Sequence, residues 1–319
     1  MEKTVGISVI APMHNEELNA EEFVSRTNKT LIQYKATYEI IIVNDGSSDS
    51  TLKTLLQLTK TYKALTIIDL ARNSGQWAAV YAGIQNSSGK HLIIMDSDLQ
   101  NLPEDIPKLH KKALEGFDLV SGVRQGRTES LFLKKIPSRT ANWMLRKVTG
   151  CPSKDMGGYK CINGDMARSF KLKAGYHRLF PALTWIAGGT VTDVNVQFPP
   201  RKYGKSHYGF SRVFDVFFDI ILFGFQQSFK SRPLYLFGRL SFFLFSISLT
   251  LFVWVLASKF MFQMDMATRP PFFISLIGFL SSFIFLSMGF MLEILNDVQN
   301  TVNQRYPYLI KDIHTTKKD

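Results

Sequence analysis

Cysteine is scarce in this chain, and acidic residues are outnumbered by basic ones. Only Cys151 and Cys161 occur among 319 residues, which is too few for a disulfide framework. Lysine and arginine number 38 against 26 aspartate and glutamate residues, which gives a formal net charge of +12. Such an excess indicates an anionic partner: a nucleic acid, an anionic lipid surface or a phosphorylated substrate.

Glycine-rich phosphate-binding motifs are also missing. No Gly-x-Gly-x-x-Gly follows an expected strand, and Gly204-Lys205-Ser206 lacks the earlier glycine of a P-loop because Pro199 stands there. These absences disfavour a nicotinamide dehydrogenase and a P-loop ATPase.

Charge of either sign is absent from two long stretches near the C-terminal end, residues 240–257 and 272–292. Stretches of this length approach or reach the ~20 apolar residues that a helix needs to cross a ~30 Å hydrocarbon core. The alternative is a pair of buried helices in a soluble core, but core helices seldom stay apolar on every face for so long. We therefore expect two transmembrane helices and contact with a lipid bilayer.

A secretory signal is not visible, because the first apolar residues, 5–11, run directly into an expected strand. Basic residues crowd into 201–239, whereas the loop 258–271 between the apolar stretches carries few charges. This asymmetry follows the positive-inside rule. We expect a multi-pass protein of the inner (cytoplasmic) membrane with both termini in the cytoplasm. With two spans nearby, lipid phosphate is the expected anionic partner rather than nucleic acid.

The first 125 residues alternate short β-rich runs with helical stretches. Strands are expected at 5–11, 38–43, 65–70, 91–95 and 118–123, and helices at 17–34, 50–61, 76–85 and 103–115. This alternation predicts an α/β fold with a mostly parallel sheet covered on both faces. Polar segments follow the first four strands, at 12–17, 44–49, 72–76 and 96–105. In a parallel sheet all four lie at the carboxyl edge, where ligands bind.

Two aspartates, Asp96 and Asp98, end the fourth expected strand one residue apart. Carboxylates this close repel each other, and a divalent cation that bridges them to a phosphate relieves the repulsion, with Gln100 as a further oxygen ligand. The alternative is a helix N-terminus in which Asp98 or Asn101 caps a helix that starts at Pro103. From this stretch alone both interpretations stay open.

The other strand ends supply further candidates. Asp45 is placed to accept hydrogen bonds from a base or a ribose, whereas Ser48 and Asp49 are better explained as caps of the next helix. Asn15 and Glu16 suit a helix N-terminus and a ligand contact equally well.

Four motifs therefore stand in order at the strand ends. They are Pro12-x-x-Asn15-Glu16-Glu17, Val43-Asn44-Asp45-Gly46-Ser47-Ser48-Asp49-x-Thr51, Arg72-Asn73-x-Gly75-Gln76 and Asp96-x-Asp98-Leu99-Gln100. Together they resemble the motifs of family 2 glycosyltransferases with a GT-A fold, in the branch of polyprenyl-phosphate glycosyltransferases. The resemblance covers nearly the whole chain, including the basic loop at 201–206 and the two apolar stretches.

This resemblance implies an inverting, metal-dependent transfer of one sugar from a nucleotide diphosphate sugar, with UDP as the first expectation, to polyprenyl (undecaprenyl) phosphate. The product would be a lipid-linked sugar donor for modifying cell-envelope glycans. The implied ligands of Mg²⁺ or Mn²⁺ are Asp96, Asp98 and Gln100, and the implied nucleotide contacts are Pro12, Asn15, Glu16, Asp45, Gln76 and Asp96. The implied acceptor-phosphate contacts are Arg124, Arg127, Arg139, Arg201 and Lys205, and the implied catalytic residues are Asp98, Asp155 and Arg124.

The chain departs from the family pattern at three places, one of which is His207, where many relatives have lysine. Asn101 stands where relatives commonly have aspartate, and Gly157-Gly158-Tyr159-Lys160 replaces a common Gly-Asp-Phe-Arg, which leaves Asp155 as the nearest carboxylate. Two alternatives remain open. A processive polysaccharide synthase would need more spans and usually a Gln-x-x-Arg-Trp motif, and no Arg-Trp pair occurs here. A catalytically inactive membrane scaffold could retain the same fold.

The expected organisation has four parts. They are a cytoplasmic GT-A domain at 1–211, an interfacial amphipathic segment at 212–233, a transmembrane hairpin at 234–295 and a cytoplasmic tail at 296–319. Asp215 and Asp219 lie one helical turn apart among apolar residues, which suits a helix at the membrane surface. By analogy with relatives we expect a homo-oligomer.

Overall fold

The chain divides into two compact units, Met1–Ile221 and Leu222–Asp319. The structure is a computed structural model, and it describes residues 5–125, 143, 145–147, 149–170, 176–200, 233–262 and 270–302. The expected interfacial segment at 212–233 therefore lies almost entirely outside the described residues.

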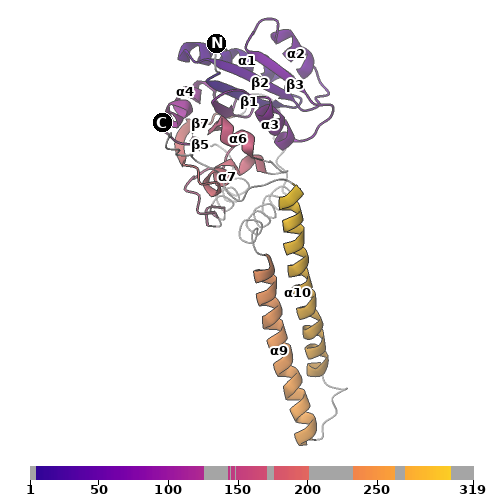
Figure 1. The fold of residues 1–319 in the computed structure, drawn as a ribbon. Coiled ribbons are helices and arrows are strands. Elements are labelled where there is room, and N and C mark those ends of the chain that lie inside the picture. Colours follow the sequence, from indigo (N-terminus) through magenta and orange to yellow (C-terminus); the bar gives the residue numbers. More distant parts are fainter. Residues whose placement is uncertain are drawn as a thin grey trace, which may run out of the picture. The chain divides into compact units, whose positions relative to one another are not determined.

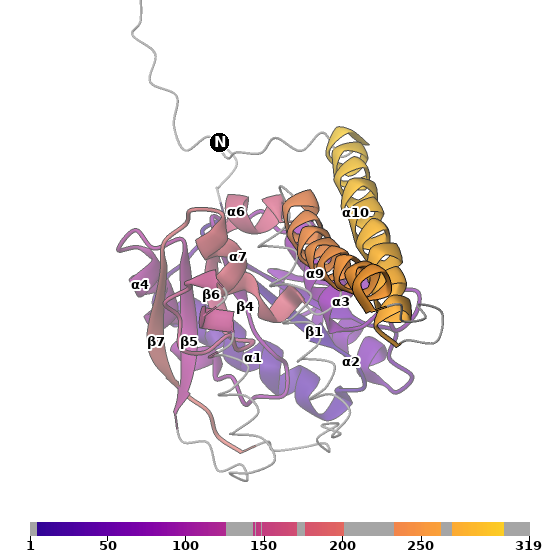
Figure 2. The same ribbon diagram turned by 90° about the horizontal axis from the view of Figure 1, so that it is seen from below.

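The first unit is built on a seven-stranded sheet with the order β3-β2-β1-β4-β6-β5-β7 (Figure 1). Its strands are β1 (Ile7–Met13), β2 (Tyr38–Asn44), β3 (Leu65–Asp69), β4 (His91–Ile94), β5 (Leu119–Gln125), β6 (Lys160–Asn163) and β7 (Val191–Gln197). Every strand except β6 runs in the same direction, because β6 pairs antiparallel with both β4 and β5. Figure 2 shows β5 and β7 side by side at one margin of the sheet.

Helices cover both faces of this sheet. They are α1 (Glu17–Tyr34), α2 (Thr51–Leu58), α3 (Gln76–Gln85), η1 (Pro103–Asp105), α4 (Ile106–Ala113), α6 (Gly164–Ser169), η3 (Tyr176–Arg178) and α7 (Phe180–Ile186). Alternate residues of β1, such as Val9 and Ala11, join a buried cluster with Phe23 of α1 and Leu109 of α4. On the other face α3 packs against β1 and β2. Burial on both faces explains why β1, β2 and β4 read as nearly continuous apolar runs.

The expected α/β class and the mostly parallel sheet are confirmed. The five strands and four helices expected in the first 125 residues are all present, with ends that differ by a few residues. β1 extends to Met13, so that Pro12 lies inside the strand and not beyond it. β6, β7, α6 and α7 are not among the expected elements, and Lys160, the last residue of the Gly157-Gly158-Tyr159-Lys160 segment, is the first residue of β6.

A buried polar chain crosses the core between α1, α4 and the start of β4. The Tyr34 hydroxyl lies 3.0 Å from Nδ1 of His110, whose Nε2 lies 3.2 Å from Nδ1 of His91. Both contacts are satisfied when the imidazoles are neutral, with Tyr34 donating to His110 and His110 donating to His91. Burial lowers the pKa of His110 to about 4, and it also lowers the pKa of His91.

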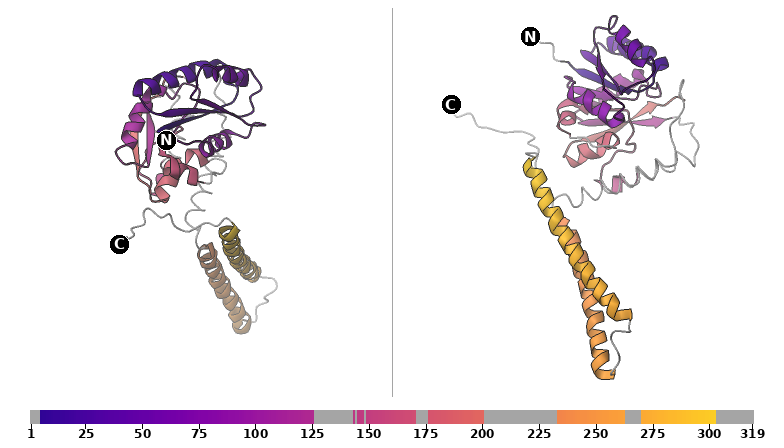
Figure 3. Two further views of the ribbon diagram at one scale, coloured as in Figure 1. Left: turned by 45° about the horizontal axis from the view of Figure 1, so that its top comes forward. Right: turned by 90° about the vertical axis from the view of Figure 1, so that its right-hand side faces the viewer.

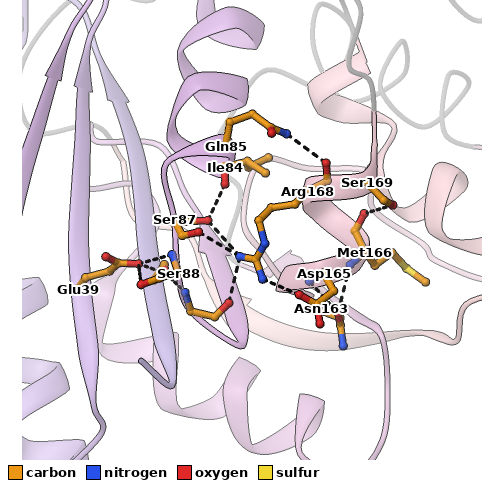
Figure 4. Close-up of polar contacts among 12 residues, drawn as sticks. Glu39, Ile84, Gln85, Ser87, Ser88, Asn163, Asp165, Met166, Arg168 and Ser169 are labelled. Atoms are coloured by element: carbon orange, nitrogen blue, oxygen red, sulfur yellow. Dashed lines mark hydrogen bonds and ion pairs between the residues drawn. The ribbon is translucent and has the colours of Figure 1, made fainter. Parts of the chain in front are cut away.

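A second polar network joins α6 to the segment that enters β4 (Figure 4). Arg168 donates from Nη1 to the carbonyl oxygens of Ser87 (3.2 Å) and Gly89 (3.3 Å), and from Nη2 to Asp165 (2.8 Å). Gln85, at the end of α3, donates in turn to the carbonyl oxygen of Arg168 (3.1 Å). Because α6 follows β6 directly, this network fixes where β6 lies along β4.

The second unit is a hairpin of two long helices, α9 (Pro233–Phe262) and α10 (Pro270–Val302), which lie side by side (Figure 3). Both are long and apolar enough to cross a membrane, with mean hydropathies of 2.3 and 2.0 over 18-residue windows inside 233–261 and 270–295. The expected stretches 240–257 and 272–292 lie inside them. α10 continues to Val302, beyond the expected end of the hairpin at Leu295.

Small residues form the seam between α9 and α10. Buried positions recur every seven residues, at Ser241, Ser248 and Val255 on α9 and at Ser275, Ser282 and Gly289 on α10. A seven-residue repeat keeps one stripe of each helix against its partner. At Gly278 the approach is so close that an added Cβ would collide with the Ser248 hydroxyl. The seam thus depends on small side chains, as in many membrane helix pairs.

Candidate active site

The strand order reverses direction between β1 and β4, and polar segments gather at the carboxyl edge beside this point. β1 leads on one side to β2 and β3, whereas β4 begins the other half of the sheet. Open α/β sheets bind ligands at such switch points. The segments after β1, β2, β3 and β4 meet here, as the sequence predicts, and β6 adds its amino end because it runs the other way.

Asp45 organises the loop that follows β3. Its carboxylate accepts hydrogen bonds from the backbone N–H groups of Ser74 (2.7 Å) and Gly75 (2.9 Å), and its side chain is 4% exposed. Gly46 next to it has φ +60°, and a Cβ there would collide with the backbone of Asn73. Glycine is therefore required where these two loops touch.

His14 joins the ends of the first three strands. Its Nδ1 lies 2.8 Å from the carbonyl oxygen of Asp45 and must donate to it, while its Nε2 accepts from Asn73 Nδ2 at 3.1 Å. The neighbouring Asn15 has φ 55°, and its Oδ1 accepts from the backbone N–H of Ser48 (2.8 Å). Asn15 therefore bridges to the loop after β2. The side chain of Glu16, the N-cap residue of α1, does not cap this helix, and the backbone N–H of Glu17 donates to Asp49 at 3.4 Å.

Asp96 and Asp98 follow β4 at the centre of this edge. Gln76, the first residue of α3, donates from its side chain to Oδ1 of Asp96 at 2.7 Å, and Asn101 lies 3.5 Å from Oδ2. The carboxylate of Asp98 accepts from the backbone N–H of Gln100 at 3.1 Å and is 7% exposed. Burial raises the pKa of Asp96, and the negative charge of Asp98 raises it further.

The carboxylates of Asp96 and Asp98 are suitable ligands for a hard divalent cation. Mg²⁺ is typically held by one or two protein carboxylates and completes its shell with substrate phosphates and water. Within the described parts of the chain, no group of three or more His, Cys, Asp or Glu side chains is placed to hold a metal ion. Gln100 donates from Nε2 to the carbonyl oxygen of Pro199 at 3.3 Å, a contact that is compatible with its amide oxygen serving as a third ligand.

Gly158 allows the segment before β6 to lie directly against Asp96. A Cβ at this position would lie 2.8 Å from Oδ2 of Asp96. Tyr159, which follows, is 1% exposed and donates its hydroxyl to the carbonyl oxygen of Leu102 at 2.9 Å. The absence of a side chain at Gly158 therefore has a steric consequence: the backbone of this segment lies where any Cβ would collide with Asp96.

The same segment holds Asp155 against Arg124. Nε and Nη2 of Arg124 each donate to one oxygen of Asp155 at 3.0 Å, which is a bidentate ion pair. Ser121 of β5 donates to the carbonyl oxygen of Asp155 at 2.6 Å, and Asp193 of β7 accepts from Ser153 at 2.7 Å. A bidentate ion pair fixes the orientation of the guanidinium plane as well as the position of the guanidinium group.

Lys160, at the amino end of β6, is a site residue that the sequence analysis does not single out. Its side chain is fully buried, and its Nζ lies 5.0 Å from the centroid of the Phe180 ring. Burial lowers the pKa of Lys160 to about 7, while the negative charges of Asp96 and Asp155 oppose this effect. A basic residue inside the strand sequence Lys-Cys-Ile-Asn is the signal in the sequence that could have drawn attention to it.

The structure brings one group of predicted site residues to this edge. They are Pro12, Asn15, Glu16, Asp45, Gln76, Asp96, Asp98, Gln100, Arg124 and Asp155. Pro12 contributes its carbonyl oxygen, which accepts from the Ser97 hydroxyl at 2.9 Å. The remaining predicted acceptor-phosphate residues, Arg127, Arg139, Arg201 and Lys205, lie outside the described residues. His14 and Lys160 join the edge in addition.

Solved structures with the same fold define the class of protein. Glucosyl-3-phosphoglycerate synthase from Mycobacterium tuberculosis, in complex with Mn²⁺, UDP-glucose and glycerol 3-phosphate, matches with a TM-score of 0.53 at 19% identity over 68% of this chain and 78% of its own. The same enzyme with Mg²⁺ and UDP matches with a TM-score of 0.53 at 20% identity over 68% and 79%. The fold is that of a GT-A glycosyltransferase.

The sequence comparisons are more specific. The family model for glycosyl transferase family 2 matches residues 8–171. The chain is 32% identical over 318 residues to dodecaprenyl-phosphate galacturonate synthase of Rhizobium johnstonii, covering 98% of this chain and 94% of that protein. It is 32% identical over 323 residues to undecaprenyl-phosphate 4-deoxy-4-formamido-L-arabinose transferase of Salmonella choleraesuis, covering 96% and 93%. The chain belongs to glycosyl transferase family 2.

Proposed function

We propose that this protein transfers one sugar from a nucleotide diphosphate sugar to the phosphate of a polyprenol, with inversion at the anomeric carbon. The product is a sugar linked to a membrane lipid, for use in modifying cell-envelope glycans. UDP is the first choice of nucleotide and undecaprenyl phosphate the first choice of acceptor. Two relatives that match over nearly the whole chain are named for polyprenyl-phosphate sugar chemistry, which supports this proposal.

The observation that carries the proposal is the position of Asp96 and Asp98. Both stand at the switch point of the sheet, with the Arg124–Asp155 pair at the neighbouring strand ends. A donor diphosphate needs its charge neutralised, and an acceptor phosphate needs to be oriented. One edge thus offers carboxylates for a cation and a fixed arginine for a phosphate.

The proposed donor site lies around β1, β2 and β4. Asp96 and Asp98, with Gln100, would hold Mg²⁺ or Mn²⁺, which would neutralise charge on the departing nucleoside diphosphate. Gln76 holds Asp96 in place through the 2.7 Å hydrogen bond. Asp45 acts chiefly by shaping the loop at Ser74 and Gly75 beside the nucleoside. The further proposed nucleotide contacts are Pro12, Asn15 and Glu16.

The proposed acceptor site is centred on Arg124. Asp155 fixes the guanidinium so that it can orient the incoming phosphate. An oxygen of this phosphate attacks the anomeric carbon, the bond from that carbon to the diphosphate breaks, and its electron pair leaves with the nucleoside diphosphate. Because the second pKa of a phosphate monoester is about 6, the nucleophile is already charged near neutral pH and needs no strong general base. Arg127, Arg139, Arg201 and Lys205 are proposed as further phosphate contacts.

The test is transfer by the full-length protein in membranes. Labelled UDP- and GDP-sugars are supplied one at a time with undecaprenyl phosphate and Mg²⁺ or Mn²⁺, and the lipid product is separated. We expect one donor to give a lipid that carries a single sugar. Asp98→Asn should lower the rate by about a hundredfold or more, because several kcal/mol of charge stabilisation is lost.

Asp165→Asn is the matched control. It makes the same chemical change at a carboxylate that is 96% exposed in its side chain and lies at the start of α6. This variant should transfer sugar at the parental rate. A long polymer as product would instead favour a processive synthase, and no lipid product with any donor would favour an inactive scaffold.

The proposal also includes the membrane location, the orientation and the oligomeric state of the enzyme. The two apolar helices anchor it in the inner membrane, with the first unit and both termini in the cytoplasm, and the protein forms a homo-oligomer. Cysteine accessibility at positions 2 and 318, measured in intact and opened vesicles, tests the orientation. Sizing by light scattering in detergent tests the oligomer, and a monomer there would contradict it.

A further inference from the structure

The aromatic ring of Phe198 lies over the guanidinium group of Arg124. The Cζ atom of Arg124 is 5.2 Å from the centroid of this ring, which is within the range of a cation–π contact. The pairing of β5 with β7 explains the contact, because Arg124 stands opposite Val196 and Phe198 comes two residues later. Strand pairing therefore brings a half-buried aromatic ring to an arginine of the active-site edge.

Phe198 and Asp155 restrain different motions of Arg124. Asp155 accepts two hydrogen bonds of 3.0 Å along one edge of the guanidinium, which opposes rotation within its plane. The Phe198 ring packs against a face of the guanidinium, which opposes tilting out of the plane and uses no N–H donor. An incoming phosphate thus meets a cation whose orientation is already set, and such preorientation lowers the cost of a productive encounter.

The backbone on both sides of Phe198 is bound to the segment that follows β4. The N–H group of Gln197 donates to Oδ2 of Asp105 at 3.0 Å, and the carbonyl oxygen of Pro199 accepts from Nε2 of Gln100 at 3.3 Å. These two hydrogen bonds hold the ring from both sides along the chain. The segment that carries the proposed metal ligands therefore also fixes the position of the ring.

The two acids of η1 contact different elements. Asp105 accepts from the end of β7, as described, whereas Glu104 accepts from Nε and Nη2 of Arg26 in α1 at 2.9 and 2.8 Å. Acids in a first helical turn are usually explained by the helix dipole, but here each makes a tertiary contact as well. The neighbouring pair offers a matched comparison, because only Asp105 reaches the strand end that carries Phe198.

We propose that Phe198 is a positioning residue for the acceptor phosphate, and that Asp105 acts through it. The ring of Phe198 holds the guanidinium of Arg124 in the orientation that Asp155 sets, and Asp105 and Gln100 hold the ring. This inference rests on the proposed function, in which Arg124 orients the phosphate of a polyprenol. It adds that the segment after β4 serves both substrates, the donor through its carboxylates and the acceptor through Phe198.

The first test measures the acceptor with and without transfer, in the full-length protein. Phe198→Leu keeps an apolar side chain but removes the ring. It should lower kcat/KM for undecaprenyl phosphate about fivefold, the ratio that corresponds to about 1 kcal/mol of cation–π attraction. The KM of the sugar donor should stay at the parental value, and Phe198→Tyr, which keeps the ring, should restore kcat/KM. The dissociation constant of undecaprenyl phosphate, measured by thermophoresis in detergent without a donor, should rise by the same factor in Phe198→Leu.

A double-mutant cycle tests whether Asp105 acts through the ring. Asp105→Ala should lower kcat/KM for undecaprenyl phosphate, and its combination with Phe198→Leu should be no slower than Phe198→Leu alone. Glu104→Ala is the matched control, since it removes the neighbouring carboxylate and leaves the contact with Gln197 in place. It should keep the parental kcat/KM. Effects of Asp105→Ala and Phe198→Leu that multiply would show that Asp105 acts independently of the ring and would overturn this part of the proposal.

A spectroscopic readout needs neither donor nor acceptor. In protein labelled with ¹⁵N-arginine, the Nε–H signal of Arg124 is identified by its loss in Arg124→Lys. Protons over an aromatic ring resonate upfield, so Phe198→Leu should move this signal downfield and Phe198→Tyr should leave it near its parental position. An unmoved signal in Phe198→Leu would contradict the contact, and a moved signal with unchanged acceptor affinity and kcat/KM would contradict the positioning role.

Failure of the proposed transfer would be a separate outcome. A parent protein that transferred no sugar from any donor would contradict the proposed function. The Nε–H signal of Arg124 and the affinity for undecaprenyl phosphate would still decide the role of Phe198, because neither measurement requires transfer. Equal affinity in the parent and in Phe198→Leu would then overturn the inference on its own.

Discussion

The chain of Tyr34, His110 and His91 makes the stability of the first unit depend on pH. His110 is 8% exposed, and burial followed by the charge of His91 lowers its pKa from 6.5 to about 4. Protonation of His110 would put a charge in the core and would remove the acceptor for the Tyr34 hydroxyl. The experiment therefore lowers the pH from 7 to 4 and compares the parent protein with a variant that lacks the His110 imidazole.

The sign and the size of the pH dependence follow from the linkage between proton binding and unfolding. Between pH 6.5 and about 4 the unfolded chain binds a proton at His110 and the folded chain does not, so the free energy of unfolding falls as the pH falls. The contribution is complete above pH 6.5 and is lost by about pH 4. At 1.36 kcal/mol per pKa unit, the loss is about 3 kcal/mol. The lowered pKa of His91 adds to the slope in the same direction.

The assay is urea unfolding of the full-length protein in detergent, at a series of pH values. Emission of Trp77 in α3, in a background that lacks the other tryptophans, follows the first unit alone. His110→Gln should flatten the pH dependence between 6.5 and 4 by about 3 kcal/mol relative to the parent.

Tyr34→Phe is the control for this variant. It removes the hydroxyl that lies 3.0 Å from His110 but keeps the buried imidazoles. We expect a loss of about 1 kcal/mol at pH 7. The slope between pH 6.5 and 4 should stay steeper than that of His110→Gln, because burial of the imidazole is the largest cause of the lowered pKa. If His110→Gln kept the parental slope, the reasoning from the buried neutral imidazole would be refuted.

Three further predictions concern the active-site edge, the hairpin and the network at α6. Gly158→Ala puts a methyl group 2.8 Å from Asp96 and should raise the Mg²⁺ or Mn²⁺ concentration for half-maximal transfer about tenfold; an unchanged metal titration would contradict it. Gly278→Leu forces a side chain against Ser248 and should destabilise the hairpin by about 1–3 kcal/mol, seen as a lower melting temperature in detergent. Arg168→Gln should lower the unfolding free energy of the first unit in urea by about 2 kcal/mol with transfer per folded molecule retained; lost transfer at full stability would count against a structural role.

The first half of the sheet is predictable from the sequence because apolar strands alternate with helical stretches. β1 and β2 are nearly continuous apolar runs, and α1 carries 18 residues. β6 has only Cys161 and Ile162 between a lysine and an asparagine, and β7 carries Asp193 and Asn195 among its valines, so neither gives a clear apolar signal. Their places in the sheet depend on pairing with β5, which is a tertiary effect.

The active-site edge is predictable where side chains follow a parallel strand, as Asp45 and Asp96 do. β6 runs antiparallel, so the residues that reach the edge precede the strand, and a search after strand ends misses Lys160. Only the family resemblance predicts a role for Asp155. The hydrogen bonds from Ser74 and Gly75 to Asp45 depend on how two loops fold together, and a local sequence pattern does not encode them.

The small-residue seam of the hairpin leaves its helices with little polar chemistry compared with the first unit. Serine hydroxyls of the hairpin donate hydrogen bonds within their own helix: Ser275 donates to the carbonyl oxygen of Phe272, and Ser282 donates to that of Phe279. Between residues 240 and 257, and between 272 and 292, neither helix carries an ionisable group. Ionisable residues inside a membrane are what relay protons or guide ions. Along these two stretches the hairpin therefore offers no side chain that could gain or lose a proton.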